Sequence, residues 1–170
     1  MSDTLTILRS LSIPCTKHFE LQDEKLKESS KGTALKFDAQ EMEISGLDDL
    51  GGALSALEGN RQAVIIRGKS IDGLPTTDVH RRQEQFESVP RQWCLIDIDD
   101  LLIPEEFEDF NNYLPELVEA SIQQLPPEFQ NVDCWYQFSS SMGVKKGKIR
   151  IHLWFWLSRK VFDSEMKVWL

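Results

Sequence analysis

The clearest pattern in the chain is a regular alternation from Lys148 to Leu157, in which every second residue is Ile, Leu or Phe. Side chains of a β-strand point in turn to the two faces of a sheet, so this alternation predicts a strand with one buried face. The apolar face consists of Ile149, Ile151, Leu153, Phe155 and Leu157. The second face is unusual because it carries Arg150, His152, Trp154 and Trp156.

A second strand is predicted by the apolar run from Trp93 to Ile98, which ends in three carboxylates. Asp97 and Asp99 stand two residues apart, so both point to one face of an extended strand and Asp100 points to the other. Neighbouring carboxylates repel each other, and a hard divalent cation such as Mg2+ takes oxygen ligands of this kind. The stretch therefore indicates a metal site. A plain strand end, at which Asp99 and Asp100 begin a turn, explains the same residues equally well.

The remaining apolar residues predict short elements around these two strands. Leucines at spacings of three and four predict a helix from Leu47 that stops at Gly59. A helical pattern opens at Pro104 and continues to Ile122, and Pro115 should kink or split it. Residues 1–32 are polar and weakly patterned. Further elements are expected as a hairpin of 34–37 and 41–44 with its turn at 38–40, strands at 62–67 and 133–140, and a helix start at 163–165.

Length and composition indicate one globular domain. The chain has 170 residues, of which 41% are hydrophobic, and this is enough to bury a core. No apolar run approaches the roughly 18 residues that a membrane span needs, and residues 1–11 lack the features of a secretory signal. The three cysteines are far apart and form no C-x-x-C pair, which indicates buried thiols: Cys15, Cys94 and Cys134. We therefore expect a cytoplasmic protein with no membrane partner.

Charge is distributed unevenly along the chain, whose net charge is −9. The acidic sum argues against a protein that coats nucleic acid by bulk electrostatics. The segment from Ser141 to Lys160 nevertheless holds six basic residues and no acid, whereas acids collect between Glu105 and Glu119. A basic face on one strand and an acidic pair on another suit phosphoryl transfer on a nucleotide, because carboxylates hold metal ions and bases neutralise phosphate.

The strand face that carries His152 also has ordinary explanations. A single histidine in a strand is more often an imidazole packed on the sheet surface, here between Trp154 and Arg150. Trp154 and Trp156 are likewise more often packing residues, although aromatic side chains can stack on nucleic-acid bases.

Three segments together resemble the archaeo-eukaryotic primase superfamily, especially the primases encoded by plasmids, phages and integrative elements. Leu95 to Asp99 resembles the first motif of that family, in which hydrophobic residues lead to D-x-D. Residues 139–143 followed by 149–156 are similar to the second motif, a strand with a histidine that contacts the incoming nucleotide. Residues 86–91, Phe-Glu-Ser-Val-Pro-Arg, resemble the lead-in to the acidic strand in primases of mobile elements. The segments occur in the family's order.

The resemblance implies an α+β fold with an RRM-like mixed sheet core, flanking helices and an added N-terminal α/β unit. A single primase-like domain of 1–170 would consist of an N-terminal unit at 1–68, a polar connection at 69–91 and a core at 92–170. The implied function is that of a DNA primase or primase-polymerase in the replication of a mobile element. Its implied partners are nucleoside triphosphates and a DNA template, with Mg2+ or Mn2+ as cofactor. A helicase on the same or another chain is a further candidate partner.

The resemblance also implies roles for individual residues. Asp97 and Asp99 would be catalytic metal ligands, and His152 would hold the triphosphate. The nucleotide site would further include Ser139, Ser140, Ser141, Lys148 and Arg150. A small residue is commoner in the family at the position of Arg150. Contacts with nucleic acid are expected from Arg81, Arg82, Lys145 and Lys146.

The third motif of the family, a hydrophobic residue followed by an acid on a strand, has no counterpart in the sequence. Asp163 is a poor substitute because it stands at a predicted helix start. We therefore expect either the N-terminal catalytic portion of a longer protein or a naturally shortened relative. The 170-residue chain should fold at least partly and polymerise poorly or not at all by itself. Two alternatives stay open. One is a non-catalytic RRM-like module that binds nucleic acid or nucleotides, and the other is a haloacid-dehalogenase-like phosphatase, whose D-x-D usually lies near the N-terminus.

Overall fold

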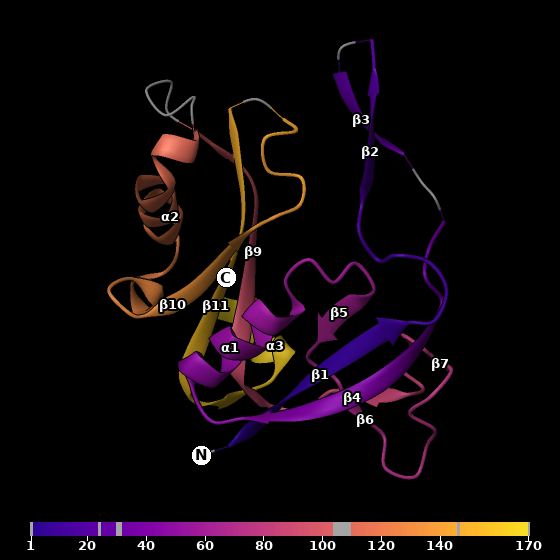
Figure 1. Ribbon diagram of the computed structural model, residues 1–170. Helices are drawn as coiled ribbons and strands as arrows, with labels where there is room; N and C mark the ends of the chain where they lie inside the picture. Colours follow the sequence, from indigo (N-terminus) through magenta and orange to yellow (C-terminus); the bar gives the residue numbers. More distant parts are fainter. Residues whose placement is uncertain (1, 24, 30–31, 104–109, 146, 170) are drawn as a thin grey trace. The chain divides into compact units, whose positions relative to one another are not determined.

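The computed structural model describes residues 2–23, 25–29, 32–103, 110–145 and 147–169 (Figure 1). The chain forms two compact units: unit 1 is Met1–Gln92 with Arg159–Asp163, and unit 2 is Trp93–Ser158 with Ser164–Leu170. Small sheets and separate helices make up both, so the predicted α+β class is confirmed. All pairings whose register is described are antiparallel, whereas a mixed sheet was expected. Among the described residues, no helix is long and apolar enough to cross a membrane.

Unit 1 is built on a four-stranded sheet with the strand order β5, β1, β4, β7. These strands are β1 (Asp3–Ser10), β4 (Lys36–Ile44), β5 (Ala63–Ile66) and β7 (Val79–His80). Strand β1 pairs with β4 on one side and with β5 on the other. It is almost entirely buried, including the polar Thr6, and a strand that is buried on both faces shows no clean alternation in its sequence. This is why residues 3–10 gave no strand signal.

Strand β4 runs without interruption from Lys36 to Ile44, so the predicted hairpin of 34–37 and 41–44 is wrong. The expected turn residues 38–40 pair with residues 7–9 of β1. Pairing along the whole strand satisfies every backbone N–H and C=O group facing β1, which outweighs the local preference of Asp38 for a turn.

One core cluster of this sheet consists of three buried side chains, Leu8, Phe37 and Val79. They come from β1, β4 and β7, so burial of their apolar surface holds the short β7 against β4. Cys15 and Val64 pack against the cluster from the segments beside it.

The rest of unit 1 consists of one helix and two small hairpin-like sheets. Helix α1 (Leu47–Leu57) confirms the predicted helix, and Gly59 beyond its end has a φ of +74°, which glycine adopts without strain. The paired strands are β2 (His18–Gln22) with β3 (Lys25–Ser29), and β6 (Lys69–Ser70) with β8 (Phe86–Glu87). Residues 69–91 therefore contribute three short strands to unit 1, although a polar connection was expected there.

Unit 2 contains a three-stranded sheet with the strand order β10, β11, β9. Its strands are β9 (Arg91–Leu102), β10 (Cys134–Phe138) and β11 (Lys148–Val161). They confirm the strands predicted at 93–98, 133–140 and 148–157, and β11 is longer than expected. Strands β10 and β11 pair antiparallel, with Gln137 opposite His152.

The apolar face of β11 is buried as predicted, through Ile149, Ile151, Leu153 and Phe155. The ring of Phe129, from η3 (Pro127–Phe129), lies 5.1 Å from that of Phe155 and 5.8 Å from that of Trp169 in α3 (Asp163–Trp169). Helix α3 begins where a helix start was predicted. Helix α2 (Leu114–Ile122) follows η2 (Phe110–Asn112) and has Pro115 in its first turn, so the helical pattern is split there as expected. The first part of that pattern, 104–109, lies outside the described residues.

Candidate functional site

The predicted acidic pair and the predicted histidine lie on neighbouring strands, β9 and β11, and face each other. Nε2 of His152 is 3.4 Å from Oδ1 of Asp97. The side chains of Asp97 and His152 are 53% and 30% exposed, and that of Asp99 is 59% exposed. A charged ligand can therefore reach all three from solvent.

Arg150 lies on the same face of β11 as His152 and is held by protein groups. Its Nε and Nη2 atoms donate hydrogen bonds of 3.0 and 2.9 Å to Oδ1 of Asp100. Its Nη1 atom donates to Oγ of Ser141 at 2.8 Å, and Nε is 3.6 Å from Oδ1 of Asp99. Only 13% of this side chain is exposed, so most of its guanidinium is occupied by the protein rather than open to a ligand.

Asp100 lies on the same face as Asp97 and Asp99, and the prediction that it points the other way is wrong. The reason is its backbone, which has a φ of +63° and so interrupts the alternation of the strand. Aspartate is one of the few residues besides glycine that adopt this left-handed conformation at modest cost. We call Asp100, Arg150, Lys145 and Ser141 the Arg150 cluster.

The carboxylate of Asp100 is strongly stabilised in its ionised form by this cluster. Nζ of Lys145 lies 2.8 Å from Oδ2, and Lys148 donates a 3.2 Å hydrogen bond to the Asp100 backbone carbonyl. The hydrogen bonds from Lys145 and then Arg150 lower the pKa of Asp100 to about 2. The same carboxylate raises the pKa of Arg150. The cluster therefore keeps its charges at any physiological pH.

The predicted serine turn is fixed to β11 by backbone and side-chain bonds. The N–H of Ser139 donates to the carbonyl of Arg150 at 2.9 Å, and the N–H of Met142 donates to the carbonyl of Ser139 at 2.8 Å. The hydroxyls of Ser139 and Ser141 are 3.1 Å apart, and Ser141 is buried. Ser140 is the exposed serine of the three, so its hydroxyl is the one open to a ligand.

Trp154 is a packing residue and not a stacking platform. It is 4% exposed, and its ring lies 5.7 Å from that of Trp93 on β9. This pair joins β11 to β9 next to the strand positions that carry His152 and Asp97. It therefore fixes the relative position of the two predicted motifs.

The site as a whole balances three acids with three bases: Asp97, Asp99 and Asp100 against Lys145, Lys148 and Arg150. The three carboxylates differ in how far the basic side chains neutralise them. Asp100 is saturated by its basic neighbours, whereas Asp97 and Asp99 are more than half exposed. The pair of exposed carboxylates is therefore the part of the site that can accept a cation.

The donor set of Asp97 and Asp99 fits Mg2+ or Mn2+ as a partly protein-bound ion. Mg2+ keeps several waters and is usually held by one or two carboxylates together with substrate phosphates. No group of three or more His, Cys, Asp or Glu side chains suited to a metal occurs within the described part of the chain. Phosphate oxygens and water would have to complete the coordination shell.

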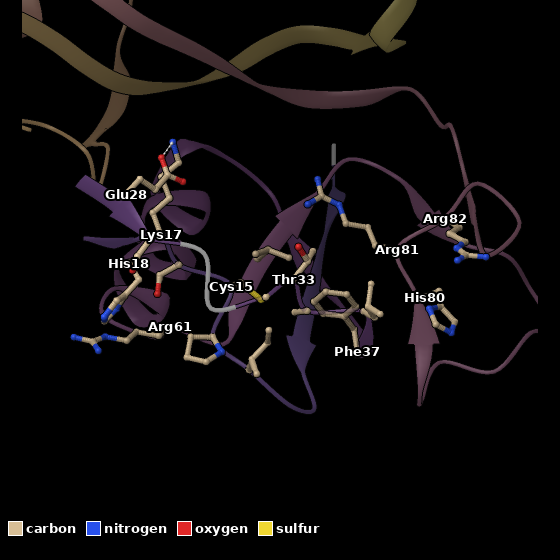
Figure 2. A pocket seen from close by; sticks show the side chains of 18 residues that line it. Cys15, Lys17, His18, Glu28, Thr33, Phe37, Arg61, His80, Arg81 and Arg82 are labelled. Atoms are coloured by element: carbon tan, nitrogen blue, oxygen red, sulfur yellow. Dashed lines mark ion pairs between the residues drawn. The ribbon is translucent and has the colours of Figure 1, made fainter. Parts of the chain in front are cut away.

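The predicted nucleic-acid contacts are distributed over both units. Lys145 belongs to the Arg150 cluster, and Lys146 lies outside the described residues. Arg81 and Arg82 follow β7 in unit 1, where they line a pocket (Figure 2).

The residue that the sequence analysis missed is Asp100. Two signals were available: a third acid directly after D-x-D, and an arginine where the resembling family more often has a small residue. Comparison of the chain with protein-family models, with curated proteins and with solved structures finds no match.

Proposed function

We propose that this protein is a DNA primase or primase-polymerase in which Asp97 and Asp99 bind the catalytic metal ions and His152 binds the triphosphate. The observation that carries the proposal is the 3.4 Å distance between His152 and Asp97. It brings the residues that resemble the first and second primase motifs to adjacent positions on two strands.

In this proposal each side chain has a distinct task. Asp97 and Asp99 would hold the metal ions, which would supply positive charge to neutralise the phosphates during transfer. His152, whose Nε2 lies 3.4 Å from Asp97, would donate a hydrogen bond to a phosphate oxygen of the triphosphate. Ser140 offers an exposed hydroxyl beside the same strand face.

The contacts of Arg150 support a positioning role rather than the direct nucleotide contact that was expected. Arg150 connects Asp100 on β9 with Ser141 in the serine turn. A guanidinium held by two acceptors fixes the distance between the segments that carry the two motifs. Lys148 is likewise engaged with the backbone of Asp100, and its ammonium keeps donors available for phosphate.

On this proposal the protein works in the cytoplasm with nucleoside triphosphates and a DNA template, in the replication of a mobile element. Arg81, Arg82 and Lys145 are the described basic residues proposed to contact nucleic acid. A helicase on the same or another chain would supply the single-stranded template.

The test is a metal-dependent incorporation assay with labelled nucleotides on primed and unprimed DNA. The wild type is expected to incorporate nucleotides only weakly, because its sequence lacks the acid of the third motif. Asp97→Asn and Asp99→Asn should each abolish this incorporation, whereas the control Asp48→Asn, an exposed acid in the first turn of α1, should retain it. Template or nucleotide binding without any incorporation would instead favour the non-catalytic module. Metal-dependent release of phosphate from a phosphomonoester would favour the phosphatase.

A further inference from the structure

Unit 1 contains a pocket of about 770 Å3 that includes none of the motif residues (Figure 2). The segment between β1 and β2, the end of β3, the start of β4 and the residues after β7 all contribute to its wall. Apolar side chains form part of the lining, among them Ile13, Ala34, Phe37 and Val64. Phe37 belongs to the core cluster and Val64 packs against it, so this part of the pocket is rigid.

The pocket is basic, in contrast to the net charge of −9 of the chain. Glu28 is the single acid of its described lining, and it is 3.8 Å from Lys17. Arg61, Arg81 and Arg82 also line the pocket, and no ion pair is described between any of them and a carboxylate of the described residues. Three exposed guanidinium groups around an apolar surface favour an anionic ligand.

The positions of these basic groups limit the chemical class of ligand that the pocket can bind. Lys17 and Arg61 lie on one side of the pocket, and Arg81 and Arg82 lie on the other (Figure 2). Guanidinium groups bind phosphate through paired hydrogen bonds, while the apolar lining suits a flat ring and the hydroxyl of Thr33 suits its polar edge. The volume lies in the range of pockets for small ligands, about 300–1,000 Å3.

We propose that this pocket binds a free nucleoside phosphate, as a second ligand site made entirely by unit 1. Walls on opposite sides suit a single nucleotide, because a continuous nucleic-acid strand needs a groove that is open at both ends. The proposal goes beyond the function proposed above and reassigns Arg81 and Arg82 from contact with DNA to contact with a free nucleotide. The site uses neither the acidic pair nor His152 nor a metal ion.

The first test is binding of ATP to the whole protein in EDTA, measured by calorimetry. The double variant Arg81→Gln/Arg82→Gln and the variant Arg61→Gln should each weaken binding about tenfold or more, because each removes charge-assisted bonds to phosphate. The matched control Arg9→Gln removes the same charge from an exposed position on β1 outside the pocket and should bind as the wild type does. EDTA removes the metal ions that the proposed catalytic site needs for the triphosphate, which separates this pocket from that site.

A second test uses Cys15, which lines the pocket, as a reporter. Burial raises the pKa of its thiol, as it does for Cys134 in unit 2, so both react slowly enough for their rates to be compared. Saturating ATP should slow alkylation of Cys15 several-fold and leave the rate at Cys134 unchanged.

Several results would overturn the proposal. They are the absence of ATP binding in EDTA, equal binding by the wild type and the pocket variants, and equal protection of both cysteines. Displacement of ATP by a 5′-hydroxyl DNA oligonucleotide at equimolar concentration would make the pocket a nucleic-acid site instead. Melting temperatures close to that of the wild type would show that the variants are folded, as expected for substitutions at exposed positions.

Discussion

Arg91 forms a buried ion pair that should dominate the stability of unit 1. Arg91 is 3% exposed and Asp3 is 5% exposed, and Nη1 of Arg91 lies 3.2 Å from Oδ1 of Asp3. The same guanidinium donates to the carbonyl of Arg67 at 2.9 Å and to Oγ1 of Thr6 at 3.3 Å. We predict that Arg91→Met, which keeps the length of the side chain and removes its charge and donors, destabilises the protein strongly.

The size of the effect follows from what the substitution leaves behind. Removing one partner of a buried ion pair costs about 3–5 kcal/mol, because the other charge remains buried. Asp3 would keep hydrogen bonds from the backbone N–H groups of Thr4 and Gln92, and Nζ of Lys160 lies 3.5 Å away. We therefore expect a loss of about 3 kcal/mol, at the lower end of that range. For a chain of this length this corresponds to a decrease of roughly 6–12 °C in melting temperature.

The assay is urea unfolding monitored by tryptophan fluorescence and circular dichroism. Arg91→Met should lower the midpoint with an unchanged slope, and the control Arg9→Met, at an exposed position of β1, should change the free energy of unfolding by about 0.5 kcal/mol or less. The double variant Asp3→Asn/Arg91→Met should lose less than the sum of the two single variants. Equal stabilities of Arg91→Met and Arg9→Met would refute the argument.

Three further predictions concern unit 2. Asp100→Asn removes the charge that holds Arg150, and asparagine tolerates the left-handed backbone of this position. Because Arg150 also binds Ser141, amide hydrogen exchange in residues 139–143 should become faster. The control Asp133→Asn should have no such effect. The pKa of Asp100 is lowered from 3.8 to about 2, so the stability that its carboxylate contributes should be fully present above about pH 4. This stability should disappear as the pH falls through about 2. An acid titration in which residues 139–143 lose their protection from hydrogen exchange near about pH 5 would contradict this. His152→Ala should raise the KM for the nucleotide more than it weakens template affinity, and the opposite outcome would assign His152 to nucleic-acid binding.

The elements that could be predicted from the sequence are those whose signal is local. The alternation in 148–157 and the leucine spacing in 47–57 reflect one buried face each, and both elements occur as expected. Strand β1 could not be recognised because both of its faces are buried. A hairpin was predicted in place of the continuous strand β4 because the pairing of residues 38–40 with β1 cannot be read from those residues alone.

The candidate site was only partly predictable, because only some of its contacts follow from local sequence patterns. The meeting of Asp97 with His152 follows from two strand patterns and an adjacent pairing of the strands. The position of Asp100 depends on one backbone angle, the φ of +63°, which a strand pattern cannot reveal. The positioning role of Arg150 depends on its hydrogen bonds to Asp100, so it could not be predicted either.

The central claim, that Asp97, Asp99 and His152 form a metal and triphosphate site, can be tested without any turnover. Paramagnetic Mn2+ broadens the nuclear magnetic resonance signals of nearby backbone amides, so a titration of the labelled protein with Mn2+ and a nucleoside triphosphate locates the bound ion. The account predicts broadening at residues 96–100 and 151–153 that requires the triphosphate and is lost in Asp97→Asn and Asp99→Asn but not in Asp48→Asn. Broadening that is unchanged in the two site variants, or that is centred on other residues, would contradict it.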